Sequence, residues 1–581
     1  MADGTPPNWP AMSIAEANAA LAMSDSPLKL ADGHVRGVPM KIYVNMPDTI
    51  RQIVELAVPE YAARDFIVYE DERVTYDDMG RAISHIAHTL IDECGVKKGD
   101  RVAIAMRNYP QWPAVFFAAV SIGAIATPLN SWWTADELEY GLSDSAPRVL
   151  IVDDSILKRI DGKLPELSGI ETVFVTHSEA GSEDPRVRSL DELIGSASNW
   201  GDLPQKPLPE VALDADDDAT IMYTSGTTGR PKGALATHRA IISNIGNAQT
   251  CQARAFLRRG EMPPEPDPNE QRSSLLAIPF FHATGAFASM IPSMMLGAKI
   301  VSMYKWDTGQ ALPIIEREKI NIVGGVPAIA WQILEHPDRD KYDLSSITHV
   351  SYGGAPSAPE LVAKIKKRFP TAAPGNGWGM TETCATSCAN SAEDYVNRPD
   401  SAGVPPAAVE LKIVGPNGET LPAGEVGELW CKGPQNARLY WNRPDATAET
   451  FIDGWVVTGD LARLDEEAFL YLVDRAKDML IRGGENIYCI EVENALYDHP
   501  AVMDASVVGI PHKVLGEEVG AVVQLTPGSS LTEAELQAHL REQIAAFKVP
   551  VEIQFQSDPL PRNANGKILK QELRPRFTER A

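Results

Sequence analysis

The chain has few cysteines, no long hydrophobic run and a shortage of positive charge. Its 581 residues include six scattered cysteines without the paired spacing of a zinc site, so we expect free thiols in a reducing compartment. The N-terminus, MADGTPPNWP, lacks a basic segment followed by an apolar one, which argues against a signal peptide. The most apolar stretch, residues 114–127, is shorter than the about 20 residues that a membrane-spanning helix needs. We therefore predict a cytoplasmic protein without integral membrane association, and a buried helix and strand at 114–127.

The charge balance restricts the partners. The 53 basic side chains are outnumbered by 79 acidic ones, which gives a formal net charge of −26. A nucleic-acid-binding protein needs a basic footprint for phosphates, so we expect no nucleic-acid partner. Broad adhesion to anionic membranes is disfavoured for the same reason. An anionic small molecule is compatible with this balance, since single loops can be positive on an acidic protein. The sequence leaves a homodimer open.

Helices and strands alternate from residue 74 onward, which predicts parallel strand pairing and an α/β fold. Apolar periodicity predicts helices at 49–57, 76–92, 111–122 and 134–142, the last capped by Thr134, and strands at 101–106, 124–129 and 149–152. The composition of 201–218 indicates a linker, after which the alternation resumes. The Pro-rich, charged segment 254–274 indicates a surface loop.

The character of the chain changes twice in its last third. Residues 403–441 alternate with turn signals and are predicted to be β-rich. After Asp474 a small α+β unit is expected. Its elements are predicted as a helix at 490–497, strands at 505–510 and 519–525, and a helix at 533–546 with a capping box of Thr532 and Glu535.

The strongest chemical signal is the loop YTSGTTGRPKG at residues 223–233, which follows the apolar segment 219–222. Backbone amides and hydroxyls in such a loop wrap phosphate oxygens, and Lys232 adds a positive charge. The spacing differs from the G-x-x-x-x-G-K-[ST] loop, because Pro231 stands five residues after Gly226. Composition alone leaves a mobile surface turn as an equal alternative.

The string of this loop resembles the signature of the adenylate-forming superfamily, which includes acyl- and aryl-CoA synthetases, luciferases and adenylation domains of peptide synthetases. The resemblance extends over roughly residues 69–570, with further motifs in the family's order. It implies a large N-terminal domain of two α/β sheets and a β-rich subdomain over 1–474. A small mobile α+β domain over 475–581 is implied to carry the catalytic lysine. The residues implied to bind the ATP phosphates are Thr224, Ser225, Gly226, Thr227, Thr228 and Lys232.

Two motifs resemble the family's acyl and adenine contacts. A lone histidine is more often structural, but PFFHATG at 279–285 resembles the segment whose histidine, here His282, lies beside the acyl group and adenylate. In SYGGAP at 351–356, glycines after a strand permit close approach of the backbone to a ligand. The resemblance implies that this loop contacts adenine and forms part of the acyl pocket wall. Its residues in that role are Gly353, Gly354, Ala355 and Pro356.

The motif GWGMTET at 377–383 resembles the family's aromatic-glycine-x-threonine-glutamate segment. Trp378 replaces the usual tyrosine, so an aromatic face remains to stack on adenine while the hydroxyl is lost. The resemblance implies that Thr381 contacts the α-phosphate and that Glu382 holds Mg²⁺, which prefers hard oxygen ligands. The alternative for Glu382 alone is an exposed acid at the start of a helix.

Four further positions resemble the family's C-terminal motifs. In WVVTGD at 455–460, Asp460 is implied to bind the ribose hydroxyls together with Arg475, although Arg–Asp surface pairs are otherwise commonplace. Lys477 stands at the family's hinge, which must absorb a large backbone change. The turn RGGEN at 482–486 is implied to line the coenzyme A tunnel through Gly483, Gly484 and Glu485.

The last motif is PRNANGK at 561–567. A solvated lysine in a turn is the ordinary interpretation of any single lysine. The whole context resembles the family's catalytic lysine, so Lys567 is implied to bridge the substrate carboxylate and the ATP α-phosphate.

These motifs predict an acid–thiol ligase that uses ATP, Mg²⁺ and coenzyme A. A carboxylic acid attacks ATP to form an acyl-adenylate and pyrophosphate, and the thiol of coenzyme A then expels AMP. One alternative is an adenylating enzyme that loads a carrier protein, but no serine-bearing carrier segment follows Lys570. The other is a non-catalytic binding relative, which is expected to lack Lys567 or Glu382.

The class of acid is predicted from the candidate pocket positions. Family members that bind an α-amino acid keep an aspartate near these motifs, and none is found there. The candidate pocket positions are small or apolar, which suits an alkyl chain or an aryl ring; we favour a medium- or long-chain fatty acid, with an aryl acid as the alternative. These positions are Phe280, Ala283, Thr284, Phe287, Gly324, Val326, Gly354 and Ala385.

Overall fold

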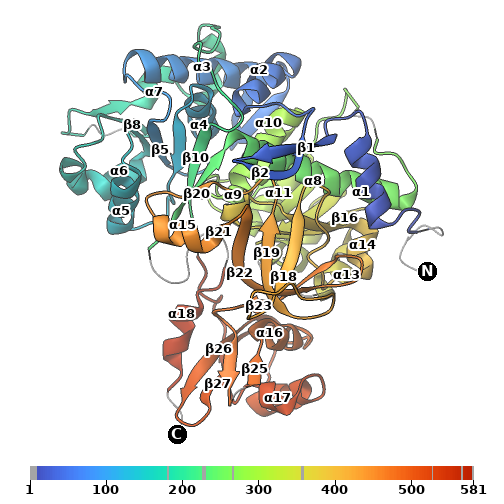
Figure 1. Cartoon of the computed structure of the whole chain (residues 1–581). Helices are drawn as coiled ribbons and strands as arrows, with labels where there is room; N and C mark the ends of the chain where they lie inside the picture. The colour runs from blue at the N-terminus through green and yellow to red at the C-terminus, as the bar shows by residue number, and fades with distance from the viewer. Residues whose placement is uncertain are drawn as a thin grey trace.

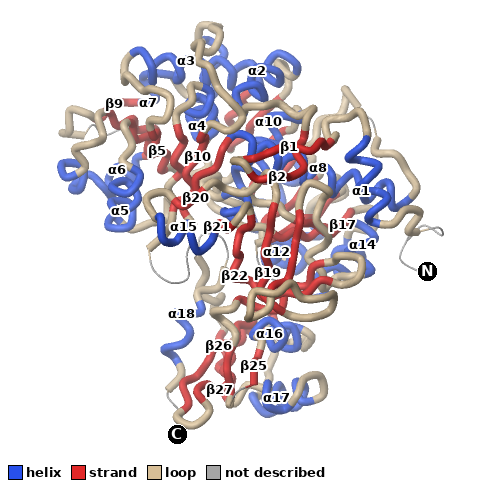
Figure 2. Tube along the Cα trace, in the orientation of Figure 1, coloured by secondary structure: helices blue, strands red, loops and turns tan. Residues whose placement is uncertain are grey.

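Two eight-stranded sheets form the framework of the larger part of the molecule (Figures 1 and 2). A five-stranded antiparallel sheet lies below them, and a small C-terminal lobe hangs beneath it (Figure 1). This arrangement confirms the predicted α/β fold. The computed structural model describes residues 9–178, 182–224, 230–264, 267–354, 357, 359–483, 485–526, 528–563 and 567–578.

The first sheet has the strand order β20-β11-β10-β6-β5-β7-β8-β9. Its strands from β10 to β9 pair in parallel, and β11 and β20 close one edge in antiparallel fashion. Helices connect most of the parallel strands, as is usual for parallel pairing. The strands are β5 (Arg101–Ala105), β6 (Ile125–Pro128), β7 (Val149–Asp153), β8 (Thr172–Thr176), β9 (Val187–Ser189), β10 (Asp218–Tyr223), β11 (Gly233–Thr237) and β20 (Leu439–Tyr440). The connecting helices are α4 (Gln111–Ser121), α5 (Ala135–Ser145), α6 (Asp154–Ile160) and α7 (Leu190–Ile194).

The second sheet has the order β17-β16-β15-β14-β12-β13-β3-β4, parallel from β16 to β3. Its strands are β3 (Asp65–Tyr69), β4 (Glu72–Thr75), β12 (Ser273–Leu276), β13 (Lys299–Ser302), β14 (Ile322–Gly325), β15 (His349–Gly353), β16 (Ala373–Trp378) and β17 (Cys388–Ser391). The helices in this part are α2 (Ile50–Glu60), α3 (Tyr76–Asp92), α8 (His238–Arg259), α9 (Ala283–Gly285), α10 (Ile291–Leu296), α11 (Thr308–Glu318), α12 (Pro327–Glu335), α13 (Pro359–Arg368) and α14 (Ala392–Asn397).

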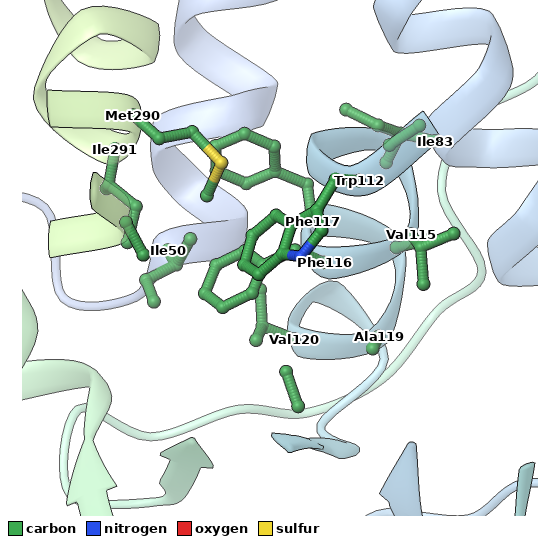
Figure 3. Close-up of a cluster of buried hydrophobic side chains, with 14 of the residues drawn as sticks. Ile50, Ile83, Trp112, Val115, Phe116, Phe117, Ala119, Val120, Met290 and Ile291 are labelled. Carbon is green, nitrogen blue, oxygen red and sulfur yellow. The ribbon is translucent and has the colours of Figure 1, made fainter. Parts of the chain in front are cut away.

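The largest hydrophobic core takes side chains from both sheets and surrounds α4. Every residue of α4 is buried, and Trp112, Phe116 and Phe117 gather there with Met290 and Ile291 (Figure 3). A helix that is apolar all round belongs inside a protein. The apolar stretch 114–127 is therefore a core helix followed by β6, as the sequence predicts. Among the described residues, no helix is long and apolar enough to cross a bilayer.

The five-stranded sheet is antiparallel throughout. Its strands are β18 (Glu410–Val414), β19 (Gly427–Lys432), β21 (Phe451–Ile452), β22 (Trp455–Leu464) and β23 (Leu470–Arg475), with α15 (Pro444–Thr450) beside them. The predicted β-rich character of 403–441 is confirmed for its middle part. The sheet extends past that range to β23, and a turn at 476–478 then leads into the small lobe.

The small lobe is an α+β unit with cores on both faces of one sheet. Its strands are β24 (Leu480–Arg482), β25 (Glu485–Ile487), β26 (Val502–His512), β27 (Gly516–Leu525) and β28 (Glu552–Gln556), and its helices are α16 (Cys489–Tyr497), α17 (Glu533–Arg541) and α18 (Lys570–Leu573). The predicted capping box of Thr532 and Glu535 is present, as is the cap of α5 by Thr134. The helix predicted at 533–546 ends five residues early, at Arg541.

The predicted loop at 254–274 is wrong for its first part. Helix α8 continues to Arg259 and ends at Gly260, which takes the left-handed conformation with φ of 78°. The arginine side chains that indicated a loop have ion-pair and hydrogen-bond partners inside the protein. Arg258 pairs with Asp394 at 2.7 Å, and Arg254 donates to backbone carbonyls that include those of Val404 and Ala389. Charged residues of this kind are buried only when paired.

The N-terminal segment forms structure that the sequence did not predict. Helix α1 (Ile14–Met23) packs on α8, and a hairpin of β1 (Leu30–Val35) and β2 (Val38–Tyr43) follows. All six cysteines of the chain are buried and free, as expected.

Candidate active site

A cavity of about 2060 Å³ opens between the larger part of the molecule and the small C-terminal lobe. Pockets for one small ligand commonly measure about 300–1,000 Å³, so this cavity has room for more than one substrate. Its walls carry predicted site residues from distant parts of the chain. Those that line it are Thr224, Lys232, His282, Ala283, Thr284, Gly324, Val326, Gly353, Gly354, Trp378, Thr381, Glu382, Ala385, Asp460, Arg475, Lys477 and Lys567.

Lys567 reaches the cavity from the small lobe. Two hydrogen bonds join it to Asn563: the Lys567 amide donates to Oδ1 at 3.0 Å, and the Asn563 amide donates to the Lys567 carbonyl at 2.8 Å. Burial, helped by the charge of Arg475, lowers the pKa of the Lys567 ammonium to about 8, while Asp460 and Glu382 act in the opposite direction. A cation is thus held among groups of both signs, in a place where its charge is poorly hydrated.

His282 follows the segment after β12 and is the N-cap residue of α9. Burial and the nearby charge of Lys567 lower the pKa of its imidazole to about 3, so the ring is neutral at physiological pH. Its Nε2 atom is buried and finds no hydrogen-bond partner among the described residues. A buried polar atom without a partner is costly, which makes this nitrogen available to a ligand.

Glu382 lies directly after β16, in the short turn Thr381–Thr383. Its side chain is buried, so the alternative of an exposed acid at a helix start is excluded. The hydroxyl of Tyr440 donates to Glu382 Oε1 at 2.5 Å, and the amide of Ala437 donates to the Glu382 carbonyl at 2.9 Å. The carboxylate therefore enters the cavity in a fixed orientation.

Asp460 and Arg475 are opposite each other on the neighbouring strands β22 and β23, and their side chains pair at 3.0 Å. The second carboxylate oxygen of Asp460 accepts a hydrogen bond from the Trp378 indole nitrogen at 2.8 Å. Trp378 itself is buried against the core of the five-stranded sheet. The replacement of tyrosine by tryptophan therefore keeps a donor at this place, although the hydroxyl is lost.

The antiparallel strands β10 and β11 flank the glycine-rich loop in the sequence, and Tyr223 pairs with Gly233. The amide of Thr224 donates to the Lys232 carbonyl at 2.8 Å and closes the base of the loop. The Lys232 ammonium lies 4.6 Å from the centre of the Tyr440 ring. Other predicted residues lie outside the described part of the chain: Ser225, Gly226, Thr227 and Thr228 in this loop, Ala355 and Pro356 in the adenine loop, and Gly484.

Two predicted acyl-pocket residues are core residues instead. Phe280 and Phe287 are fully buried in the core between the sheets and do not line the cavity. The ring of Phe280 stacks on Trp112 with centroids 5.1 Å apart, and Asn108 accepts the hydrogen bond of its amide. The aromatic residues of PFFHATG thus anchor the segment, and the small residues after them face the cavity.

The RGGEN turn stands apart from the cavity. Gly483 lies between β24 and β25 with φ of 60°, and its amide donates to the Leu515 carbonyl at 2.8 Å. Neither Gly483 nor Glu485 lines the cavity, whereas Lys567 from the same lobe does. Lys477 lies in the turn between the five-stranded sheet and the lobe and lines the cavity.

Sequence reasoning missed Tyr440. It belongs to no motif that we recognised, and a tyrosine between Leu439 and Trp441 has the appearance of an ordinary strand residue. Only the fold brings its hydroxyl to Glu382, which is 58 residues earlier in the chain.

Comparison with known families agrees with this geometry. A family model described as AMP-binding enzyme matches residues 54–441, and one described as AMP-binding enzyme C-terminal domain matches residues 491–567. The chain belongs to the AMP-binding enzyme family. The second match lies inside the range predicted for the C-terminal domain, while the boundary at 474/475 stays a prediction.

Relatives within the AMP-binding enzyme family act on different acids. Feruloyl-CoA synthase of an Amycolatopsis species is 36% identical over 504 residues, which cover 87% of this chain and 94% of that protein. Long-chain-fatty-acid–CoA ligase of Bacillus subtilis (strain 168) is 32% identical over 553 residues, covering 91% and 95%. Among solved structures, the anthranilate CoA ligase AuaEII in complex with anthranoyl-AMP has a TM-score of 0.79 at 26% identity, covering 91% of this chain and 97% of that one.

These relatives identify the protein as an AMP-forming acid–CoA ligase, an ATP-using enzyme with a carboxylic acid as substrate. The names of these relatives include both an aryl acid and long-chain fatty acids. The class of acid therefore has to be inferred from the shape of the cavity and tested by experiment.

Proposed function

We propose that this ligase forms an acyl-adenylate in the described cavity, with Lys567 bridging its two anionic substrates. The convergence of Lys567, His282, Glu382 and Asp460 on one cavity supports the proposal. A carboxylate is a poor acyl donor, because its leaving group would be oxide. Attack of a carboxylate oxygen on the ATP α-phosphorus forms a mixed anhydride and expels pyrophosphate. The Lys567 ammonium offsets the negative charge of both reactants and holds them in line.

Binding of the ATP phosphates is assigned to the loop at 224–232, with Lys232 as its cation, and to Thr381. Glu382 suits Mg²⁺, because this ion takes oxygen ligands and usually keeps waters and substrate phosphates as the others. One buried carboxylate that faces the cavity fits such a site. When bound, Mg²⁺ supplies positive charge at the phosphate oxygens. Among the described residues, no group of three or more His, Cys, Asp and Glu side chains could hold a metal.

Binding of the nucleoside is assigned to Asp460, Arg475, Trp378 and the Gly353–Gly354 backbone. Arg475 and the Trp378 indole each donate to one oxygen of Asp460. A carboxylate has about four lone-pair sites, so it can accept from the ribose hydroxyls while these bonds persist. His282, which is neutral, is assigned to the neighbourhood of the acyl group, where it adds no charge that would oppose Lys567.

For the second step the thiol of coenzyme A attacks the acyl carbonyl and expels AMP. The carboxylate and the α-phosphate are already joined at this stage, so Lys567 is no longer needed to bridge them and its lobe can leave the cavity. We assign Lys477 as the hinge of that rotation, because it lies in the turn between β23 and the lobe. The turn with Gly483, Gly484 and Glu485 then lines the tunnel for the thiol.

The pKa of Lys567 gives the first step a defined pH dependence. The ammonium form is required, and its pKa in the ligand-free enzyme is lowered to about 8. The kcat/KM for ATP in adenylation, which reports the free enzyme, should therefore fall above this pH by roughly tenfold per pH unit. The residual rate of Lys567→Ala should lack this decline. A wild-type profile that stays flat to about pH 10, the ordinary lysine range, would contradict the assignment.

For the acid itself we propose a medium- or long-chain fatty acid. The cavity follows β15 from Gly353 to His349, a distance of about 13 Å at the usual rise per strand residue. Ile245 and Ala248 of α8 form a further part of its wall. Gly324, which also lines the cavity, has no side chain and so leaves the cavity deeper at that point. An elongated cavity of this kind suits an alkyl chain better than a single ring.

A chain-length series tests the substrate class. Each buried methylene contributes roughly 0.8 kcal/mol, so kcat/KM should rise about fourfold per carbon from about C4 and peak between about C8 and C16. Pyrophosphate release is measured for these acids and for benzoates and cinnamates in one assay. Ala248→Leu should shift the optimum to shorter chains and leave the shortest acids unchanged.

An aryl acid is the second candidate, because feruloyl-CoA synthase is among the relatives at 36% identity. It predicts a flat profile among alkanoates and an aromatic acid at least about tenfold better, a difference of 1.4 kcal/mol. That outcome would replace the fatty acid and leave the adenylation chemistry untouched.

A further inference from the structure

Tyr440 connects the two parts of the site that handle the phosphates. It lies on β20, which pairs with β11 immediately after the glycine-rich loop, so that Tyr440 is opposite Ala234. The amide of the next residue, Trp441, donates to the Gly233 carbonyl at 2.7 Å. The backbone around Tyr440 is therefore fixed to the end of the loop that carries Lys232.

The same segment holds Glu382 at two points. The Ala437 amide donates to the Glu382 carbonyl at 2.9 Å, and the Tyr440 hydroxyl donates to Glu382 Oε1 at 2.5 Å. Among the described residues, no second hydrogen bond to the Glu382 carboxylate is recorded. Oε2 is thus left to face a ligand in the cavity, while Oε1 is held by the tyrosine.

Packing fixes the ring of Tyr440. The side chain is buried, and its ring lies edge-on to Phe451 with centroids 5.3 Å apart. The phenol hydroxyl is therefore held at one place, from which it donates to Glu382.

The N-terminal hairpin also holds the segment before Tyr440. The guanidinium of Arg36, at the tip of the β1–β2 hairpin, donates to the carbonyls of Asn436 and Ala437 at 3.2 and 3.4 Å. Arg36 precedes residue 54, where the family match begins, so this contact comes from outside the matched region. The segment 436–441 is therefore restrained by the hairpin, the glycine-rich loop and Glu382 together.

We propose that Tyr440 is a positioning residue for adenylation, which orients the Glu382 carboxylate and fixes its place relative to Lys232. A glutamate side chain has several rotatable bonds, and a free carboxylate would visit many orientations at the mouth of the cavity. Holding one oxygen selects the orientation in which the other meets Mg²⁺ and the phosphates, at no entropic cost during the reaction. The inference rests on the proposed role of Glu382.

Tyr440→Phe tests the inference, because it removes the hydroxyl and keeps the ring that packs on Phe451 and lies under Lys232. A hydrogen bond to a charged group accounts for about ten- to a hundredfold in an equilibrium or rate, so adenylation should fall by about that factor. The Mg²⁺ concentration for half-maximal adenylation should rise, and calorimetry should show weaker ATP binding with Mg²⁺ but unchanged binding without it. Thioesterification of preformed acyl-adenylate should stay within about twofold, since that step breaks no bond of the ATP triphosphate and expels no pyrophosphate.

Tyr471→Phe is the matched control, because the Tyr471 hydroxyl also donates to a carboxylate, that of Asp465 at 3.2 Å, outside the cavity lining. It should leave both half-reactions and the Mg²⁺ dependence unchanged. In a Glu382→Gln background, Tyr440→Phe should lose its effect on adenylation to within about twofold, because residues that act through one group are non-additive.

Three outcomes would overturn the inference. These are an unchanged Mg²⁺ dependence in Tyr440→Phe, an equal loss of both half-reactions, and an undiminished effect in the Glu382→Gln background. The last result would mean that the hydroxyl acts by another route. Full adenylation by Glu382→Gln itself would instead contradict the proposed function of Glu382, and with it the premise of the inference.

Discussion

Lys567→Ala should reduce adenylate formation to a small residual rate and leave the conversion of preformed acyl-adenylate to acyl-CoA largely intact. The ammonium faces the cavity among Arg475, Asp460 and Glu382, and it brings positive charge from the C-terminal lobe to the predicted meeting point of carboxylate and α-phosphate. Removing one preorganised donor from developing negative charge costs about 10²–10³ in rate. In the second step the carboxylate and the α-phosphate are already joined in the acyl-adenylate, and the thiolate attacks the neutral acyl carbonyl, so Lys567 no longer has to bring two anions together.

The two half-reactions separate this role from a loss of folding. Pyrophosphate release measures the first, and CoA-dependent loss of synthetic acyl-adenylate measures the second. Lys548→Ala is a suitable control, because Lys548 belongs to the same lobe and pairs with Glu491 at 2.7 Å outside the cavity lining. Equal losses in both half-reactions of Lys567→Ala, with an unchanged thermal midpoint, would show that the lysine does not have the assigned role.

Fold class and chemistry are accessible from the sequence where local patterns are strong. The apolar periodicity predicts the helix at Tyr76–Asp92 with both ends in place, and the structure adds a capping box of Thr75 and Asp78 at its start. The strands of the parallel sheets stand out as short apolar runs between these helices. The family motifs indicate the reaction, because they depend on the order and spacing of residues, which composition alone does not specify.

The parts that sequence reasoning missed depend on contacts between distant segments. Arg254 and Arg258 have the composition of a loop, and only their buried partners make them part of α8. The sequence favours Phe280 as a pocket residue, but in the structure its ring is stacked on Trp112. Tyr440 meets Glu382 through the pairing of β20 with β11, a long-range contact without a local signal.

The same limit applies to the RGGEN turn, whose proposed role requires a second arrangement of the lobe. We expect Gly483→Ala to support thioesterification and Gly483→Leu to impair it, while adenylation is the same in the two variants. Its φ of 60° strains any residue with a Cβ atom, and a Cβ there would lie 3.2 Å from Leu515 Cδ2. Alanine and leucine share this strain, so a comparison of the two variants cancels it. Leucine alone adds bulk that would enter the thiol tunnel.

We expect thioesterification by Gly483→Leu to fall about ten- to a hundredfold below that of Gly483→Ala, the range expected when side-chain atoms are forced into a filled space. Adenylation should be equal in the two variants, because Gly483 is outside the cavity lining while Lys567 is on it. The measurement is CoA-dependent turnover of preformed acyl-adenylate, with pyrophosphate release as the internal control and thermal midpoints to match the stabilities. Normal coenzyme A turnover by Gly483→Leu would place the tunnel elsewhere. A parallel loss of adenylation would instead show that the turn supports the lobe and does not line the path of the thiol.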